Sequence, residues 1–154
     1  MAAGSKHVRL FLRTAAERLT DAEALYQSDR YGGAVYLGGY GAVYLGGCGA
    51  VYLGGYVAEC GLKAMLLAAV PRYGEGEVLA SFRGAAAHSL YRLRGRYLNS
   101  RGAQFPAEVQ RDFAVLADWT VDLRYNPSHV SGADAKAFLR RAATFLRFCE
   151  SRSR

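Results

Sequence analysis

The stretch GAVYLGGYGAVYLGGCGAVYLGGYVAECGLKAMLLAA, residues 33–69, opens with three consecutive copies of one octapeptide. The copies occupy residues 33–40, 41–48 and 49–56 and differ only at their last position, where Cys48 replaces tyrosine. Such near-identity indicates tandem duplication within a chain of 154 residues. We therefore expect the repeat to decide the shape of the element that contains it.

The repeat is compatible with two conformations. In an α-helix eight residues turn through about 800°, roughly 80° beyond two full turns, so equivalent residues of successive copies do not share one face. Each glycine weakens a helix by about 1 kcal/mol, and AVYL between glycine pairs could instead form short strands joined by turns. The flank favours the helix, because Val57, Cys60, Ala64 and Leu67 follow at helical spacing. The sequence thus predicts an elongated, glycine-rich second helix before Pro71, with β-hairpins as the alternative.

The tyrosines of the repeat predict self-association. Tyrosine supplies rigid apolar area with a polar tip, and the small residues around it allow other helices to approach closely. We expect Tyr36, Tyr44 and Tyr52 to mediate a dimer or a higher oligomer. One functional hypothesis is therefore a self-assembling structural module built on the octapeptide.

The rest of the chain shows helical periodicity without strand-like alternation. Apolar residues recur at three and four residues over residues 6–28, over 81–98, from Pro106 to about Arg124, and over 131–149. Ser131 and Asp134 resemble a capping box at the start of the last helix. The sequence predicts one domain, residues 1–154, folded as an all-α, antiparallel four- to five-helix bundle that contains the repeat at 33–56.

Composition limits the classes of function. Basic residues number 20 against 13 acidic ones, a formal net charge of +7, so anionic partners such as RNA are candidates. The N-terminal residues show no secretory signal and no apolar run predicts a membrane span. Three cysteines without metal-ligand spacing predict neither a disulfide framework nor a metal site, and we expect no cofactor and a cytoplasmic location.

The order of several short motifs resembles the HEPN domain, the nucleotide-binding helical bundle of higher eukaryotes and prokaryotes. The motifs that carry the resemblance are RYGGAVYLGG (30–39), YVAECGLKA (56–64), AHSLYRL (87–93), LRYNP (123–127) and ADAKAFLRRA (133–142). Family members usually have one copy of the segment that is extended here by two octapeptides. The resemblance implies a helical bundle that dimerises and binds nucleotide, RNA or a minimal nucleotidyltransferase partner.

Catalytic members of this family are metal-independent ribonucleases that use an arginine and a histidine with four to six residues between them. The resemblance places Arg124 and His129 at this motif, so an RNase toxin is an alternative function. Pro127 interrupts the helical spacing between them. Arg83 and His88 have the same spacing, but the resemblance gives His88 a structural place in which it caps or bonds across helices.

Two further groups of residues have chemical potential. Glu59 and Lys63 have the i,i+4 spacing of a helix salt bridge. Arginines interleaved with Tyr91 and Tyr97 predict a nucleic-acid-binding patch, because guanidinium groups contact phosphate and aromatic rings stack on unpaired bases; the arginines are Arg92, Arg94, Arg96 and Arg101. The favoured hypothesis is a HEPN-like protein that binds RNA, nucleotide or a partner protein without strong catalysis.

Overall fold

The computed structural model describes residues 5–27, 48–101, 104–119 and 131–153, and every regular element in these ranges is helical. An all-α fold was expected from the sequence and is confirmed. The six α-helices are α1 (Lys6–Gln27), α2 (Cys48–Ala68), α3 (Glu75–Ala80), α4 (Leu90–Arg101), α5 (Ala107–Ala117) and α6 (Gly132–Arg152); the short 3-10 helices are η1 (Arg72–Gly74) and η2 (Ala85–His88).

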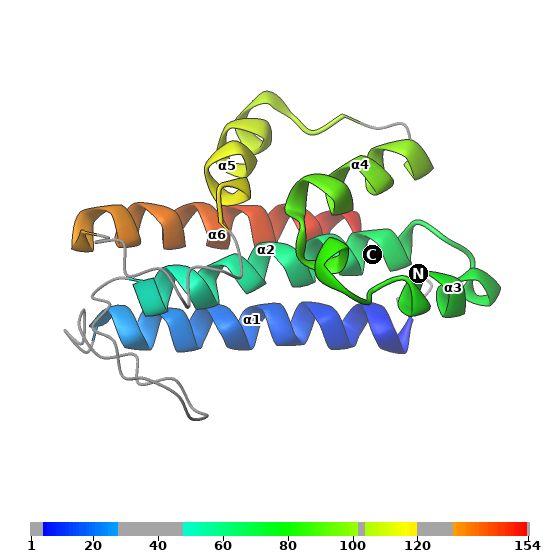
Figure 1. The fold of residues 1–154 in the computed structure, drawn as a ribbon, viewed down its shortest axis with the longest axis horizontal. Coiled ribbons are helices and arrows are strands. Elements are labelled where there is room, and N and C mark those ends of the chain that lie inside the picture. Colours follow the sequence, from blue (N-terminus) through cyan, green and yellow to red (C-terminus); the bar gives the residue numbers. More distant parts are fainter. Residues whose placement is uncertain (1–4, 28–47, 102–103, 120–130, 154) are drawn as a thin grey trace.

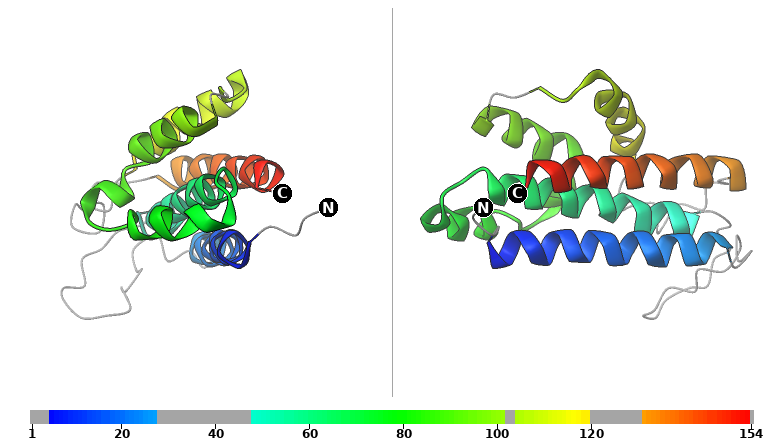
Figure 2. Two further views of the ribbon diagram at one scale, coloured as in Figure 1. Left: turned by 90° about the vertical axis from the view of Figure 1, so that its right-hand side faces the viewer. Right: turned by 180° about the vertical axis from the view of Figure 1, so that it is seen from behind.

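Three long helices form the centre of the molecule (Figure 1). Helix α2 packs against both α1 and α6, which also touch each other. Helix α1 runs opposite to α2 and α6, while α2 and α6 run in the same direction, so the bundle is antiparallel only in part (Figures 1 and 2). Helix α4 packs on α2, and α5 packs on α6. The described ranges contain six α-helices, where the sequence predicted four or five.

Helices α1 and α6 form where apolar periodicity predicted them. Helix α1 buries Val8, Ala15 and Ala22 along one stripe. The backbone N–H of Asp134 donates to Ser131 Oγ at 3.1 Å, which satisfies a free donor at the start of α6 and confirms the predicted cap. The apolar residues that recur at helical spacing along α6 are buried; they are Ala135, Phe138, Leu139, Ala142, Leu146 and Cys149.

Helix α2 contains the third octapeptide, which is helical and not a β-hairpin. The first two copies, apart from Cys48, lie outside the described residues, so the predicted length of this helix is untested. Within the described ranges, α2 includes the one helix long and apolar enough to cross a membrane, Ala50–Ala68. Since 83% of that window is buried inside the bundle, a core helix accounts for it.

The glycine pair of the third octapeptide lets α2 touch its neighbours closely. A Cβ atom on Gly55 would lie 2.1 Å from the Trp119 ring, and one on Gly54 would lie 2.9 Å from Leu139. The indole Nε1 of Trp119 donates to the Tyr52 carbonyl at 3.1 Å, and the ring lies 5.1 Å from that of Tyr56. Glycines that weaken an isolated helix are therefore required here by tertiary packing.

The prediction of a helix over residues 81–98 is wrong for residues 81–89. Residues 81–89 form turns and η2, and the regular helix, α4, begins only at Leu90. Gly84 has φ 71°, in the left-handed region that ends a right-handed helix. The preceding segment forms η1 and the short helix α3. Helix α5 begins after Pro106 as predicted and ends at Ala117, short of the expected Arg124.

Candidate nucleic-acid interface

A buried ionic network lies on the face of α2 that meets η2. Lys63 Nζ donates to Glu59 Oε1 at 2.6 Å, which confirms the predicted i,i+4 salt bridge. Both residues are buried, with 3% of Glu59 and 7% of Lys63 exposed. His88 Nδ1 lies 3.1 Å from the other carboxylate oxygen of Glu59, so His88 bonds across helices as the resemblance implied.

Phe82 connects this network to the surface. Lys63 Nζ lies 5.3 Å and Arg96 Cζ lies 5.8 Å from the centroid of its ring, within the range of cation–π attraction. Arg96 Nη2 also donates to Ser81 Oγ at 2.7 Å. The turn that carries Arg83 is thereby held against the exposed side of α4.

The arginines predicted as one patch take different positions. Arg92 and Arg96 are exposed and lie one helical turn apart on α4. Arg94 is half-buried instead, with its guanidinium 5.4 Å from the Phe105 ring and 5.3 Å from the Phe113 ring. Its Nε is buried and has no hydrogen-bond partner among the described residues. Arg94 therefore holds α4 against α5, while Arg92 and Arg96 face solvent.

The two tyrosines beside these arginines also differ. Tyr97 is 2% exposed and belongs to the core. The prediction that its ring offers a stacking surface for bases is therefore wrong. Tyr91 is 56% exposed and forms a T-shaped contact with the Phe113 ring, with 5.8 Å between the centroids. Tyr91 is the aromatic ring of this region that an unpaired base can reach.

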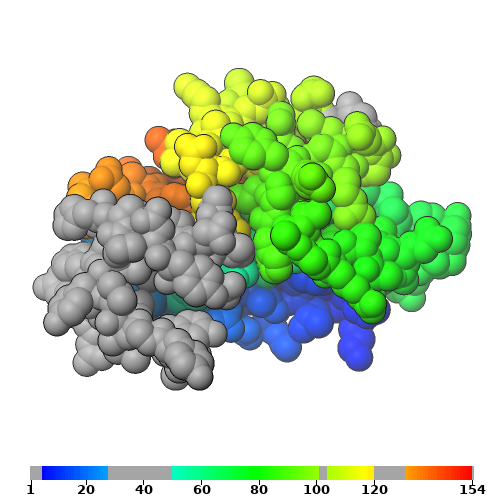
Figure 3. Space-filling view, viewed as in Figure 1, coloured from blue at the N-terminus to red at the C-terminus, as the bar shows by residue number. Residues whose placement is uncertain are grey.

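The charged residues in the sequence of this region are all basic. From residue 78 to residue 107 the chain contains five arginines and one histidine and no aspartate or glutamate. Arg83 and Arg92 form no ion pair within the described residues. We call Arg83, Arg92 and Arg96 the arginine face. Its elements form much of the surface seen in Figure 3, drawn there in green.

Several predicted site residues cannot be placed. Arg124, His129, Tyr36 and Tyr44 lie outside the described residues, and so does the side chain of Arg101. Tyr52 is described, and its hydroxyl lies 2.9 Å from that of Tyr56 while both rings pack on Trp119. A role of Tyr52 in oligomerisation stays a prediction.

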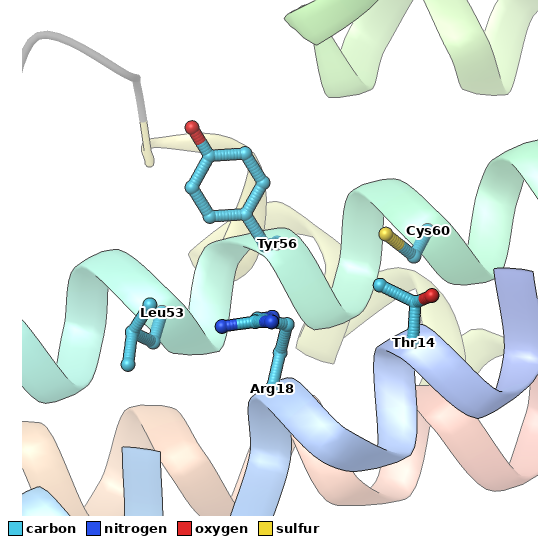
Figure 4. Close-up of a pocket in the computed structure, with 5 residues that line it drawn as sticks. All are labelled: Thr14, Arg18, Leu53, Tyr56 and Cys60. Carbon is cyan, nitrogen blue, oxygen red and sulfur yellow. The ribbon is translucent and has the colours of Figure 1, made fainter. Parts of the chain in front are cut away.

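A separate hollow of about 250 Å³ lies between α1 and α2. Figure 4 shows Thr14 and Arg18 rising from α1 toward Leu53 and Cys60 of α2, while the Tyr56 ring points away from α1. Arg18 Nη1 already bonds to Asp21 at 3.1 Å. Burial, and next the neighbouring charge of Glu59, raise the pKa of the Cys60 thiol to about 11. The hollow thus offers neither an unpaired cation nor a reactive thiol.

We expect Cys60 to resist thiol reagents in the folded protein. A pKa of about 11 leaves roughly one thiol in a thousand ionised at pH 8, and complete burial also raises the pKa of the Cys149 thiol well above its ordinary value. In a Cys48→Ser background, reaction with Ellman's reagent should run on the order of a hundredfold slower than with a free thiol and reach completion only in denaturant. Fast release of one equivalent, abolished by Cys60→Ser, would contradict this expectation.

Metal ligands do not gather in the described part of the chain, where no three His, Cys, Asp or Glu side chains converge. Comparison with protein-family models, with curated proteins and with solved structures found no match to this chain. The function is therefore inferred from the residues of the site.

Proposed function

We propose that this protein binds single-stranded RNA on the arginine face. The observation that carries the proposal is the set of exposed guanidinium groups on a stretch without a single acidic residue, residues 78–107. Such a surface attracts phosphate along its whole length, and each phosphate contact releases condensed counterions.

The exposed ring of Tyr91 supports single-stranded over double-stranded RNA. It neighbours Arg92 in the sequence and is more than half exposed. Unpaired bases stack on aromatic side chains, whereas bases in an A-form helix are not accessible in this way. The resemblance to HEPN domains supports the same class of ligand, and the proposal needs no catalytic group.

The test compares two double variants that lose the same charge. We expect Arg83→Ala/Arg92→Ala to weaken binding of a cyanine-labelled oligouridylate about tenfold or more, and to reduce the slope of log Kd against log salt by roughly 0.7 for each lost phosphate contact. The matched control is Arg140→Ala/Arg147→Ala, which removes two exposed arginines from α6. Fluorescence anisotropy between low and moderate salt measures both quantities.

Equal weakening by the two double variants would show only a general charge effect and would contradict the proposal, as would an affinity that does not depend on salt. Gel analysis of the same samples reports whether the RNA stays intact. Shortened RNA that is no longer produced by Arg124→Ala or His129→Ala would favour the nuclease hypothesis instead.

A further inference from the structure

His88 is anchored in the core on one side and exposed on the other. Its Nδ1 lies 3.1 Å from Glu59 Oε2, and the second oxygen of that carboxylate accepts from Lys63 at 2.6 Å. The His88 side chain is 40% exposed, whereas that of Glu59 is 4% exposed. His88 Nε2 has no hydrogen-bond partner among the described residues and is not among their buried, unpaired polar atoms, so solvent can reach it.

This contact fixes which nitrogen of the ring exchanges its proton. An ionised carboxylate only accepts hydrogen bonds, so Nδ1 is the donor and carries a hydrogen in both charge states of the ring. Protonation therefore occurs at Nε2 and leaves the bond to Glu59 intact. Histidine is the side chain that changes its charge most readily between pH 5 and 8.

The groups around His88 make this added charge part of the arginine face. From α2, Glu59 bonds to the ring of His88; α4, which packs on η2, carries Arg92, Arg94 and Arg96; and Arg83 lies on the preceding turn. Glu59 is the only carboxylate among these groups, and Lys63 shares it. Among these groups, a proton at Nε2 thus adds a cation whose one acidic partner, Glu59, lies on the Nδ1 side of the ring.

We propose that His88 Nε2 is a phosphate contact of the RNA interface, so that protonation of His88 tightens RNA binding as the pH falls. The proposal rests on the proposed function. It adds His88 to the residues that contact RNA and makes the RNA affinity depend on pH. The fold holds the ring in one orientation through Glu59, and only the charge of its exposed edge changes.

The experiment measures oligouridylate binding by anisotropy at pH 7.5 and pH 6.0, since uracil does not titrate in this range. We expect the wild-type Kd to be about three- to tenfold tighter at pH 6.0, with a salt slope steeper by up to roughly 0.7. In His88→Gln the affinity should be the same at both pH values. The matched control is His7→Gln, because His7 also bonds a buried glutamate, Glu75, at 3.0 Å, but on α1; this variant should keep the pH dependence.

A second measurement does not depend on RNA or on a variant. Long-range nitrogen–proton NMR spectra of the free protein should show His88 with its hydrogen on Nδ1 at high pH and protonation of Nε2 at lower pH. RNA binding that is independent of pH, pH dependence that survives in His88→Gln, or a hydrogen on Nε2 at high pH would overturn the inference. Absence of RNA binding at every pH would overturn the proposed function itself.

Discussion

Replacing Gly55 by alanine is expected to lower the free energy of unfolding by about 2–4 kcal/mol, because a single methyl group overpacks this contact. The new Cβ would lie 2.1 Å from the Trp119 ring, which is rigid and 3% exposed. The ring also cannot move without loss of its hydrogen bond to the Tyr52 carbonyl. Thermal unfolding followed by circular dichroism should show Tm lower by about 5–15 °C.

The control for this substitution is Gly95→Ala on α4, where no atom lies within 4 Å of the added Cβ. There the same change should raise the stability by up to about 1 kcal/mol, since alanine favours a helix over glycine. In a Trp119→Leu background the cost of Gly55→Ala should shrink, because the clash is with the indole. A Gly55→Ala variant as stable as wild type would mean that Trp119 does not pack on the third octapeptide.

This contact illustrates what the sequence could not reveal about the fold. Helices α1 and α6 are predictable because each buries one stripe and exposes the rest, and Ser131 marks the start of α6. Helix α2 is buried on nearly every side, so its sequence has little periodicity, and its glycines suggested hairpins equally well. Gly55 is required because it contacts Trp119, which lies 64 positions further along the chain, and no local sequence pattern indicates this contact.

The candidate site was predictable to a similar degree. Spacing alone indicated the bond between Glu59 and Lys63, but it did not indicate the bond from His88 to the same carboxylate, which the chain brings from 29 residues away. The arginine patch was predicted only from arginines that are close together in the sequence. On a helix, residues two apart project about 200° from each other, so Arg94 lies on the α5 side while Arg92 and Arg96 face solvent.

Removal of the carboxylate at the centre of the buried network has the other large expected effect. Lys63 is 7% exposed, and Glu59→Gln removes the negative charge that pairs with its ammonium group. Loss of one partner of a buried ion pair costs about 3–5 kcal/mol. The glutamine amide keeps one accepting oxygen, so it can no longer accept from both Lys63 and His88. We expect chemical denaturation to show this loss as a lower midpoint with an unchanged slope.

The matched control for Glu59→Gln is Glu17→Gln on α1, which breaks an i,i+4 pair with Arg13 that has an N–O distance of 3.6 Å and side chains 58% and 72% exposed. Because water screens that pair, its loss should cost less than about 0.5 kcal/mol. The double variant Glu59→Gln/Lys63→Met should recover much of the stability, since an apolar side chain needs no buried counter-charge. Equal losses in the two single variants would show that Glu59 and Lys63 are solvated in the folded protein, and the anchoring of His88 would then require another explanation.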